Sequence, residues 1–264
     1  NNDEKIGKLV ALAITSAGKD GSITVEEARS IETSLDLVEG FRFDGGYVSS
    51  SFITNERRGA VVYDEPLIMV TDEKIENVQD ILPVLEQVAR ESRPFVIVGS
   101  DFEGQGLAAL IMNAIRGSMR VAAVKAPRYG EERKNILRDL ALSVGATFIS
   151  RESGLRLKDT KLEHLGSCRK IDVLKNETTI IGGTGDSDAV VEKMDALRVE
   201  LQQTDSMHEC ERIQDRISRL NSGVAVIRVG AATEVEMIEK RHRIEDALEA
   251  VKSAQQEGIL AGGG

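Results

Sequence analysis

The last helix that the sequence predicts, residues 233–253, carries several carboxylates, and one of them stands apart. Most of its acidic side chains alternate with Lys and Arg, which is typical of a solvated helix face. Asp246 instead lies between Ile244 and Leu248 in the sequence RIEDAL. Asp is a mediocre helix former, and an exposed helix face more often carries Glu or Lys. The pattern therefore indicates a special role for the Asp246 carboxylate, but it does not identify that role.

Two glycine-rich stretches could bring backbone amides close to a phosphate. GGTGDSD, at residues 182–188, lacks the third glycine of a dinucleotide-binding turn, and no acidic residue follows at the required distance. A tight turn followed by an Asp or Ser helix N-cap is the better interpretation. The second stretch, AGGG at residues 261–264, leaves two alternatives open. It is either a flexible tail or part of a phosphate loop.

The other residues with chemical potential are scattered along the chain. His164, His208 and His242 do not have the spacing of metal ligands. Cys168 and Cys210 lack C-x-x-C spacing, which predicts free thiols and a reducing compartment. A small-molecule α/β enzyme would place a catalytic group of residues at the carboxyl ends of its strands. No Ser-His-Asp or Cys-His arrangement can be argued from the spacing, which disfavours that class.

One predicted helix is unusual because it is apolar over more than half of its circumference. Residues 107–115 read LAALIMNAI, and a sheet covers only one side of a helix. The sequence therefore predicts an exposed apolar strip, which is typical of an interaction site. The preceding helix places Leu82, Leu85 and Val88 on one stripe, a pattern that by itself is typical of a core.

Short apolar strands and amphipathic helices alternate through the middle of the chain. The expected strands are 66–70, 94–99, 120–125 and 146–150, and the expected helices are 77–91, 103–117 and 131–145. Such alternation predicts βαβ units, hence an α/β fold with a mainly parallel β-sheet flanked by helices. The strands are apolar on both faces, as buried parallel strands are.

Predicted elements from both ends of the chain flank this region. Residues 190–201 and 207–220 predict an antiparallel helical hairpin, because both carry apolar residues at helical spacing and a short linker joins them. We expect residues 1–38 and 225–256 to form one small α+β domain, into which an α/β domain of residues 39–224 is inserted. Few contacts should cross such a junction, so it could act as a hinge.

The net charge of −10 and the pI near 5.0 argue against a nucleic-acid partner, which requires a basic face. No run approaches the ~18 apolar residues of a membrane span. The first residues do not resemble a signal peptide. These features favour a cytoplasmic protein. The first residue is not Met, so we expect that the sequence is trimmed at its beginning. We expect the same at its glycine-rich end.

Several long motifs resemble group I chaperonins, the bacterial GroEL type. They are AAVKAP at 122–127, GVAVIRVGAATEVEM at 223–237, EKRHRIEDAL at 239–248 and, with several changes, VEGFRFDGGYVSSSF at 38–52. The resemblance covers all 264 residues. It implies that residues 39–224 are the apical domain and that the two flanking segments are arms of the intermediate domain. It also implies that residues 257–264 begin the equatorial ATP-binding domain.

The resemblance implies a molecular chaperone that works in an ATP-driven, homo-oligomeric, sevenfold ring. In that family the apical domain binds non-native polypeptides and a GroES-type co-chaperonin through an apolar groove between two helices. The matching positions are Tyr47, Phe52, Leu82, Leu85, Leu107, Ile111 and Met112. Apolar groups left in water attract the exposed apolar groups of an unfolded chain without sequence specificity.

The same resemblance implies roles in ATP hydrolysis. Asp246 matches an aspartate that orients or activates the water attacking the γ-phosphate. Gly262, Gly263 and Gly264 match the start of a glycine stretch beside the nucleotide, where bare backbone approaches the ligand. ATP and Mg²⁺ are the expected cofactors of the full-length protein. The phosphate loop and the Mg²⁺-binding aspartate would lie outside these 264 residues, so we expect this chain alone to bind no cofactor and to hydrolyse no ATP.

An alternative is a polypeptide-binding module that works without ATP as an isolated apical domain. The two hypotheses differ only in whether the gene continues beyond these residues.

Some positions depart from the family's pattern. Gly45 stands where the family usually has an Arg that pairs with a carboxylate at the position of Glu234, which puts that inter-subunit contact in question. Ser50 and Ser51 replace a Pro-Tyr pair and so remove one groove aromatic.

Arg128 and Tyr129 replace a Gly-Phe pair, which predicts a differently built turn. Together the departures predict a divergent member with altered use of the co-chaperonin or other partners.

Overall fold

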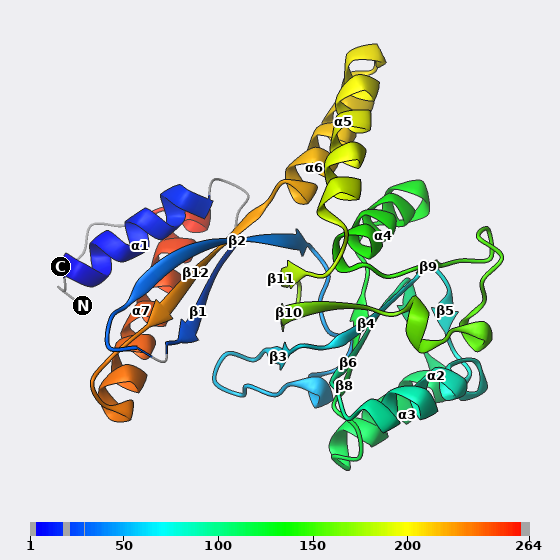
Figure 1. Ribbon diagram of the computed structural model, residues 1–264, viewed down its shortest axis with the longest axis horizontal. Coiled ribbons are helices and arrows are strands. Elements are labelled where there is room, and N and C mark those ends of the chain that lie inside the picture. Colours follow the sequence, from blue (N-terminus) through cyan, green and yellow to red (C-terminus); the bar gives the residue numbers. More distant parts are fainter. Residues whose placement is uncertain (1–3, 18–21, 29, 260–264) are drawn as a thin grey trace. The chain divides into compact units, whose positions relative to one another are not determined.

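The structure, a computed structural model, describes residues 4–17, 22–28 and 30–259. It divides into two compact units (Figure 1). Unit 1 takes the residues up to 38 and those from 223 onward, and unit 2 takes residues 39–222. The division falls inside strand β2 (Ser34–Phe43), whose first half belongs to unit 1 and whose second half belongs to unit 2. Unit 1 is therefore built from both ends of the chain and unit 2 from one continuous segment.

Unit 1 packs two helices against two parallel strands. Its elements are α1 (Glu4–Ala17), β1 (Ser22–Glu27), β12 (Gly223–Val229) and α7 (Glu234–Glu257), together with the start of β2. β1 and β12 pair in parallel, and both helices contact the two strands. Ile6, Val10 and Ala13 of α1 are buried against β12 and Ile244 of α7. Apolar residues at helical spacing thus form the buried side of α1.

Unit 2 contains a sheet with helices packed on it (Figure 1). Besides β2, its strands are β3 (Val61–Asp64), β4 (Leu67–Thr71), β5 (Lys74–Ile75), β6 (Phe95–Gly99), β7 (Asp101–Phe102), β8 (Val121–Lys125), β9 (Phe148–Ile149), β10 (Gly166–Val173) and β11 (Thr178–Gly183). Its helices are α2 (Val78–Glu91), α3 (Gly104–Ile115), α4 (Gly130–Val144), α5 (Ser187–Gln203) and α6 (Met207–Leu220). Short 3-10 turns lie at η1 (Ser50–Phe52), η2 (Leu157–Asp159) and η3 (Leu162–His164).

The sheet of unit 2 is mixed. β4, β6, β8 and β9 pair in parallel, as the alternation of strands and helices predicts. β10 pairs antiparallel with β3, β4 and β11, and β11 pairs antiparallel with β2. The expectation of a mainly parallel sheet is therefore wrong for the part of the sheet that β2, β3, β10 and β11 form. An apolar strand does not reveal its direction, and β10 and β11 are joined by a tight turn in which Leu174 N donates to Glu177 O.

The sequence does not predict β2, β3, β5 or β7. The stretch that contains β2 has turn-forming residues and aromatics, which obscure its period. Within it Phe41 and Phe43 are only 1% and 2% exposed, and the two rings pack at 6.3 Å between centroids. Pairing with β11 organises this strand, and that contact joins residues more than a hundred positions apart.

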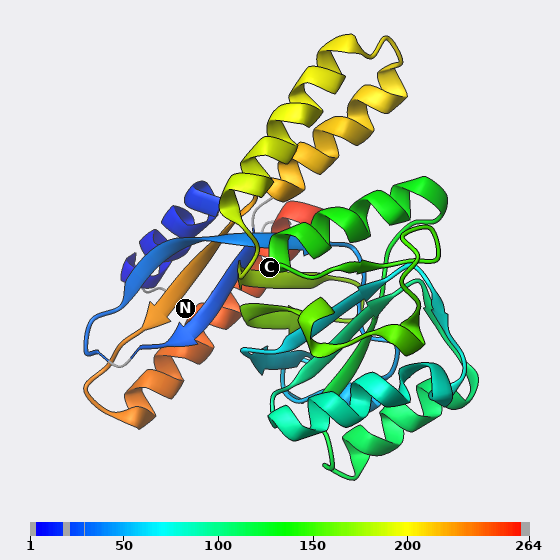
Figure 2. The ribbon, with the colours of Figure 1, turned by 45° about the vertical axis from the view of Figure 1, so that its right-hand side comes forward.

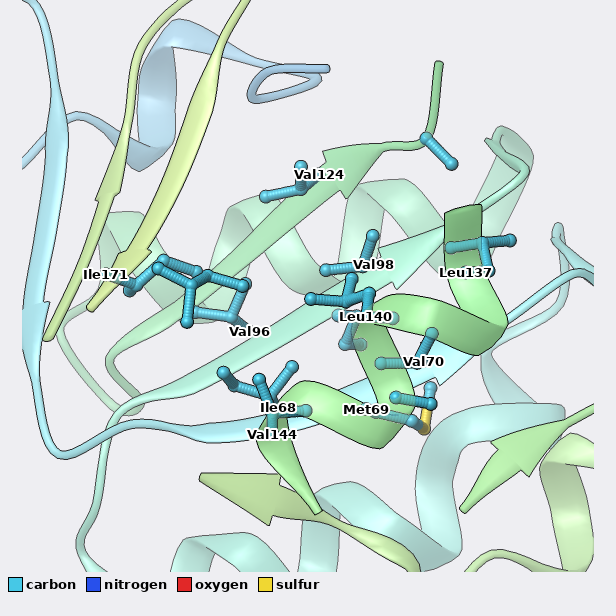
Figure 3. Close-up of a cluster of buried hydrophobic side chains, with 14 of the residues drawn as sticks. Ile68, Met69, Val70, Val96, Val98, Val124, Leu137, Leu140, Val144 and Ile171 are labelled. Carbon is cyan, nitrogen blue, oxygen red and sulfur yellow. The ribbon is translucent and has the colours of Figure 1, made fainter. Parts of the chain in front are cut away.

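Aliphatic side chains fill the space between α4 and the sheet. Figure 3 shows Leu137, Leu140 and Val144 of α4 among Ile68, Met69 and Val70 of β4, Val96 and Val98 of β6, Val124 of β8 and Ile171 of β10. All ten are completely buried. Full burial of such a side chain contributes about 1.5–3 kcal/mol, so this layer holds α4 on the sheet.

Helices α5 and α6 form the predicted antiparallel hairpin (Figure 2). The hairpin contacts α4 through an ion pair. Arg216 of α6 donates from Nε to Oδ2 of Asp139 and from Nη2 to Oδ1, both at 2.8 Å. The side chains of Asp139 and Arg216 are only 3% and 12% exposed. This buried, bidentate ion pair fixes the orientation of the hairpin on α4. Either charge would be strongly destabilising there without its partner, because water does not solvate it.

Arg216→Leu is expected to lower the free energy of unfolding by about 3 kcal/mol, because it leaves the Asp139 carboxylate buried without its partner. Urea titration followed by circular dichroism measures the change. The double variant Asp139→Leu, Arg216→Leu should recover most of the loss. Arg198→Leu is the control, since it removes an exposed pair with Asp195 and should cost less than about 1 kcal/mol. Equal losses in Arg216→Leu and Arg198→Leu would contradict the assignment.

Candidate functional site

The apolar site residues that the sequence predicts lie mainly on two neighbouring helices. Helices α2 and α3 pack against each other, as Figures 1 and 2 both show. We use the name α2–α3 surface for Leu82 of α2 together with Leu107, Ile111, Met112 and Ile115 of α3. Leu82 and Met112 are each 44% exposed and Ile115 is 64% exposed. Leu107 and Ile111 are half-buried and pack against the core. An apolar surface is thus present on these two helices.

Three further predicted residues lie beneath or beside this surface. Leu85 is 6% exposed and Phe52 is 1% exposed, so both are core residues. Phe52 belongs to η1, which contacts α3 and β8. Tyr47 is half-buried and forms an isolated antiparallel bridge with Val124 of β8. Leu85 and Phe52 therefore support the helices from inside and present little area to a partner.

Ile115 is the most exposed apolar side chain of α3, and it is not among the predicted site residues. It continues the series Leu107, Ile111, Ile115, in which each residue is four positions after the previous one and lies on the same side of the helix. Extending that series by one turn would have found it.

Ser50 and Ser51, which the sequence analysis compares with a Pro-Tyr pair, belong to a polar turn next to α3. Ser49 caps η1 because its Oγ accepts a hydrogen bond from Ser51 N at 3.2 Å. Ser50 and Ser51 are exposed. This turn therefore presents hydroxyl groups that water can solvate.

Gly45 lies where a side chain does not fit. A Cβ at this position would lie 2.4 Å from the carbonyl oxygen of Lys125. The same turn is fixed by Thr178, whose Oγ1 donates to Gly45 O at 2.6 Å. No side chain here is available to pair with a carboxylate. Glu234 itself is exposed and is the first residue of α7 in unit 1.

The turn before α4 contains Arg128 in the left-handed region, with a φ of 62°. Glycine adopts this conformation freely, whereas another residue does so at a cost of about 1–2 kcal/mol. Arg133 supports it by donating from Nε to Arg128 O at 2.8 Å. Tyr129 is 83% exposed. The turn thus places an unshielded aromatic ring at the start of α4.

Asp246 lies on α7 of unit 1 and is exposed, whereas its neighbour Ile244 is fully buried in the core of that unit. The helix therefore turns the Asp246 carboxylate towards solvent. Gly262, Gly263 and Gly264 lie outside the described residues.

Metal and phosphate chemistry have little support among the residues that the structure describes. Within residues 4–17, 22–28 and 30–259, no group of His, Cys, Asp and Glu is arranged to hold a metal ion. The GGTGDSD stretch forms the predicted turn and N-cap, with Asp186 Oδ1 accepting from Asp188 N at 3.0 Å. No described helix is both long and apolar enough to cross a membrane.

Together these features define an α/β protein that carries an exposed apolar surface on two helices and a solvent-facing carboxylate in a second unit. An exposed apolar surface of this kind is typical of an interaction site. A family model described as the TCP-1/cpn60 chaperonin family matches residues 1–264. The chain belongs to this family. Its members are chaperones that bind substrate polypeptides, assemble into oligomeric rings and use ATP and Mg²⁺.

The two cysteines differ in burial, which predicts a difference in reactivity. Burial raises the pKa of the Cys168 thiol to about 12, so at pH 8 almost none of it is the reactive thiolate. Cys210 is half-buried on α6. We expect iodoacetamide at pH 8 to label Cys210 in the folded protein and to spare Cys168, as read by peptide mass spectrometry. Both should react in urea, and Cys210→Ser should remove the native-state label. Labelling of folded Cys168 at the rate seen in urea would contradict this.

Proposed function

We propose that this chain is the polypeptide-binding part of a group I, GroEL-type chaperonin. In this proposal unit 2 is the apical domain and unit 1 is the intermediate domain. The observation that carries the proposal is the α2–α3 surface, on which Leu82, Met112 and Ile115 remain 44–64% exposed although each is apolar. Apolar side chains gathered on adjoining helices favour contact with the apolar segments of unfolded chains.

The size of this surface suits weak, reversible binding. Full burial of one Leu, Met or Ile side chain contributes about 1.5–3 kcal/mol, and these three are already partly buried. One subunit therefore gains only a few kcal/mol from them, before the entropy of ordering the ligand is subtracted. A homo-oligomeric ring, sevenfold in this proposal, presents several such surfaces to one unfolded chain and raises its effective affinity.

A GroES-type co-chaperonin is the second partner in the proposal. A lid that places an apolar segment on the α2–α3 surface would compete with bound polypeptide and displace it. The exposed serines at positions 50 and 51 and the absence of a side chain at Gly45 support altered use of this partner.

An isolated module that binds polypeptides without ATP remains the second candidate. One observation favours it: the whole α2–α3 surface lies in unit 2, which is a continuous segment with its own core.

The double variant Leu82→Glu, Met112→Glu is expected to weaken binding of a fluorescent, permanently unfolded polypeptide by about tenfold or more, because two charges replace apolar contacts. Fluorescence anisotropy measures the dissociation constant. Val191→Glu on α5 is the matched control, since Val191 is 48% exposed and lies outside the α2–α3 surface. Unchanged binding in the double variant, or an equal loss in Val191→Glu, would remove the basis of the proposal.

We propose that Asp246 orients the water consumed in ATP hydrolysis, with ATP and Mg²⁺ as cofactors of the complete protein. The support is its resemblance to the family's aspartate together with its exposure on α7. A carboxylate that accepts a proton from water can align that water for attack on phosphorus. Gly262, Gly263 and Gly264 are proposed to lie beside the nucleotide.

In the complete chaperonin, Asp246→Ala is expected to lower ATP turnover by about a hundredfold while ATP binding is retained, because only the alignment of water is lost. Phosphate release and equilibrium nucleotide binding provide the two readouts. Glu249→Ala is the control, because it removes an exposed carboxylate from the same helix. Full turnover in Asp246→Ala would refute the assigned role.

A further inference from the structure

The beginning of α3 is held against the residues that precede α2 by backbone hydrogen bonds. Glu103 N donates to Ile75 O at 2.9 Å, and Gly106 N donates to Glu76 O at 2.7 Å. The short strands β5 and β7 pair in parallel at the same place, with Ile75 opposite Phe102. Only Asn77 separates Glu76 from α2, which begins at Val78. The two helices are therefore fixed to each other at their N-terminal ends.

Side chains reinforce this junction. Ile75 and Phe102 are 0% and 3% exposed and belong to the core of unit 2. Lys74 Nζ lies 2.6 Å from Glu103 Oε2, and this hydrogen bond is the main cause of the raised pKa of Lys74. The junction is therefore both packed and tied by an ion pair on its solvent side.

Gly106 makes the close approach possible. A Cβ on Gly106 would lie 2.9 Å from Ile75 Cγ2 and 3.2 Å from the carbonyl carbon and oxygen of Glu76. Cβ atoms essentially never come within 3.0 Å of a non-bonded heavy atom of a residue distant in the chain. The φ of Gly106 is not positive, unlike that of Gly104 at 57°, so the backbone conformation does not require glycine here. What requires it is the short distance between α3 and the segment leading into α2.

The C-terminal end of α2 is held by a side chain instead. Arg120, the residue immediately before β8, donates from Nη2 to the carbonyl oxygen of Ser92, the C-cap of α2, at 2.8 Å. A long, exposed side chain makes this link, so it accommodates small changes in spacing more readily than a backbone contact does. Ile115, the most exposed residue of the α2–α3 surface, lies at this end.

We infer that Gly106 sets the separation of α2 and α3 near Leu82 and Leu107, and thereby selects the apolar side chains that this surface accepts. In this inference, the close approach of α3 to Ile75 and Glu76 keeps the helices near each other at this end, which favours polypeptide segments rich in aliphatic side chains over segments rich in large aromatic ones. The inference rests on the proposed function, since it assumes that polypeptides bind to the α2–α3 surface. In this inference Gly106 determines which polypeptide segments bind, because it sets the position of α3.

The test compares two fluorescent peptides of identical sequence except that one carries Leu and the other Trp at its apolar positions. The unmodified chain should bind the Leu peptide more tightly. Gly106→Ala should move α3 outward by a few tenths of an ångström and shift the ratio of dissociation constants towards the Trp peptide by about threefold or more. Anisotropy titrations give both constants, and thermal unfolding checks that the variant is folded.

Gly7→Ala is the matched control. Gly7 also lies inside a helix, α1, but a Cβ there meets no atom within 4 Å. It gains the same helix propensity from alanine without displacing a neighbour, and it should leave the peptide ratio unchanged. A shift of the same size in Gly7→Ala would overturn the inference.

Other outcomes separate this inference from the proposed function. If Leu82→Glu weakens both peptides but Gly106→Ala leaves their ratio unchanged, the inference is wrong and the binding surface stands. If Leu82→Glu weakens neither peptide, the proposed function fails and the inference fails with it. If Gly106→Ala does not fold, the unmodified chain still tests the inference. Equal or tighter binding of the Trp peptide to that chain would overturn the proposed selection.

Discussion

A helix that packs on a sheet buries one of its sides, and this geometric constraint underlies the surface of unit 2. Helix α3 is apolar around most of its circumference, so burying Leu110 completely against the core still leaves Met112 and Ile115 in contact with water. The exposed apolar area costs stability in the isolated protein. It persists in a folded domain because the aliphatic layer between α4 and the sheet stabilises the unit independently of it.

Backbone hydrogen bonds and buried side chains support this surface from beneath, which matters for the weak binding of many sequences that we propose. Backbone hydrogen bonds tie the start of α3 to residues 75 and 76, and the buried side chains of Leu85 and Phe52 hold the two helices from below. In the proposed function, a partner therefore meets a largely preformed surface and does not have to order it, which reduces the entropic cost of binding. The proposed promiscuity then comes from the non-directional character of apolar contact and from the flexible side chain of Met112.

The proposed binding surface and the candidate hydrolytic carboxylate belong to different units. The α2–α3 surface lies in unit 2, whereas Asp246 lies on α7 of unit 1, where its neighbour Ile244 anchors the helix. Under the proposed function this division has a meaning, because nucleotide chemistry and polypeptide binding would influence each other through the chain that connects them. Strand β2 contributes residues to both units and is one covalent route for such coupling.

Much of this protein is determined by local sequence. Helical spacing predicts α2 to α7, because apolar residues that recur every three or four positions lie on one side of each helix. The alternation of apolar strands and helices predicts the parallel part of the sheet. The excess of apolar residues in α3 predicts an exposed surface, and the motifs around residues 223–248 indicate the chaperonin family that the match over the whole chain confirms. Each of these signals is contained in a short stretch of sequence.

Contacts between distant residues decided the rest. The direction of β10 and β11, the existence of β2 as a strand, and the burial of Leu85 and Phe52 all depend on partners far along the chain. The role of Gly106 is of the same kind, since a glycine in a helix has no local explanation until Ile75 is found against it. Helical spacing specifies which residues share a side of a helix, but only tertiary packing specifies how much of that side remains in water.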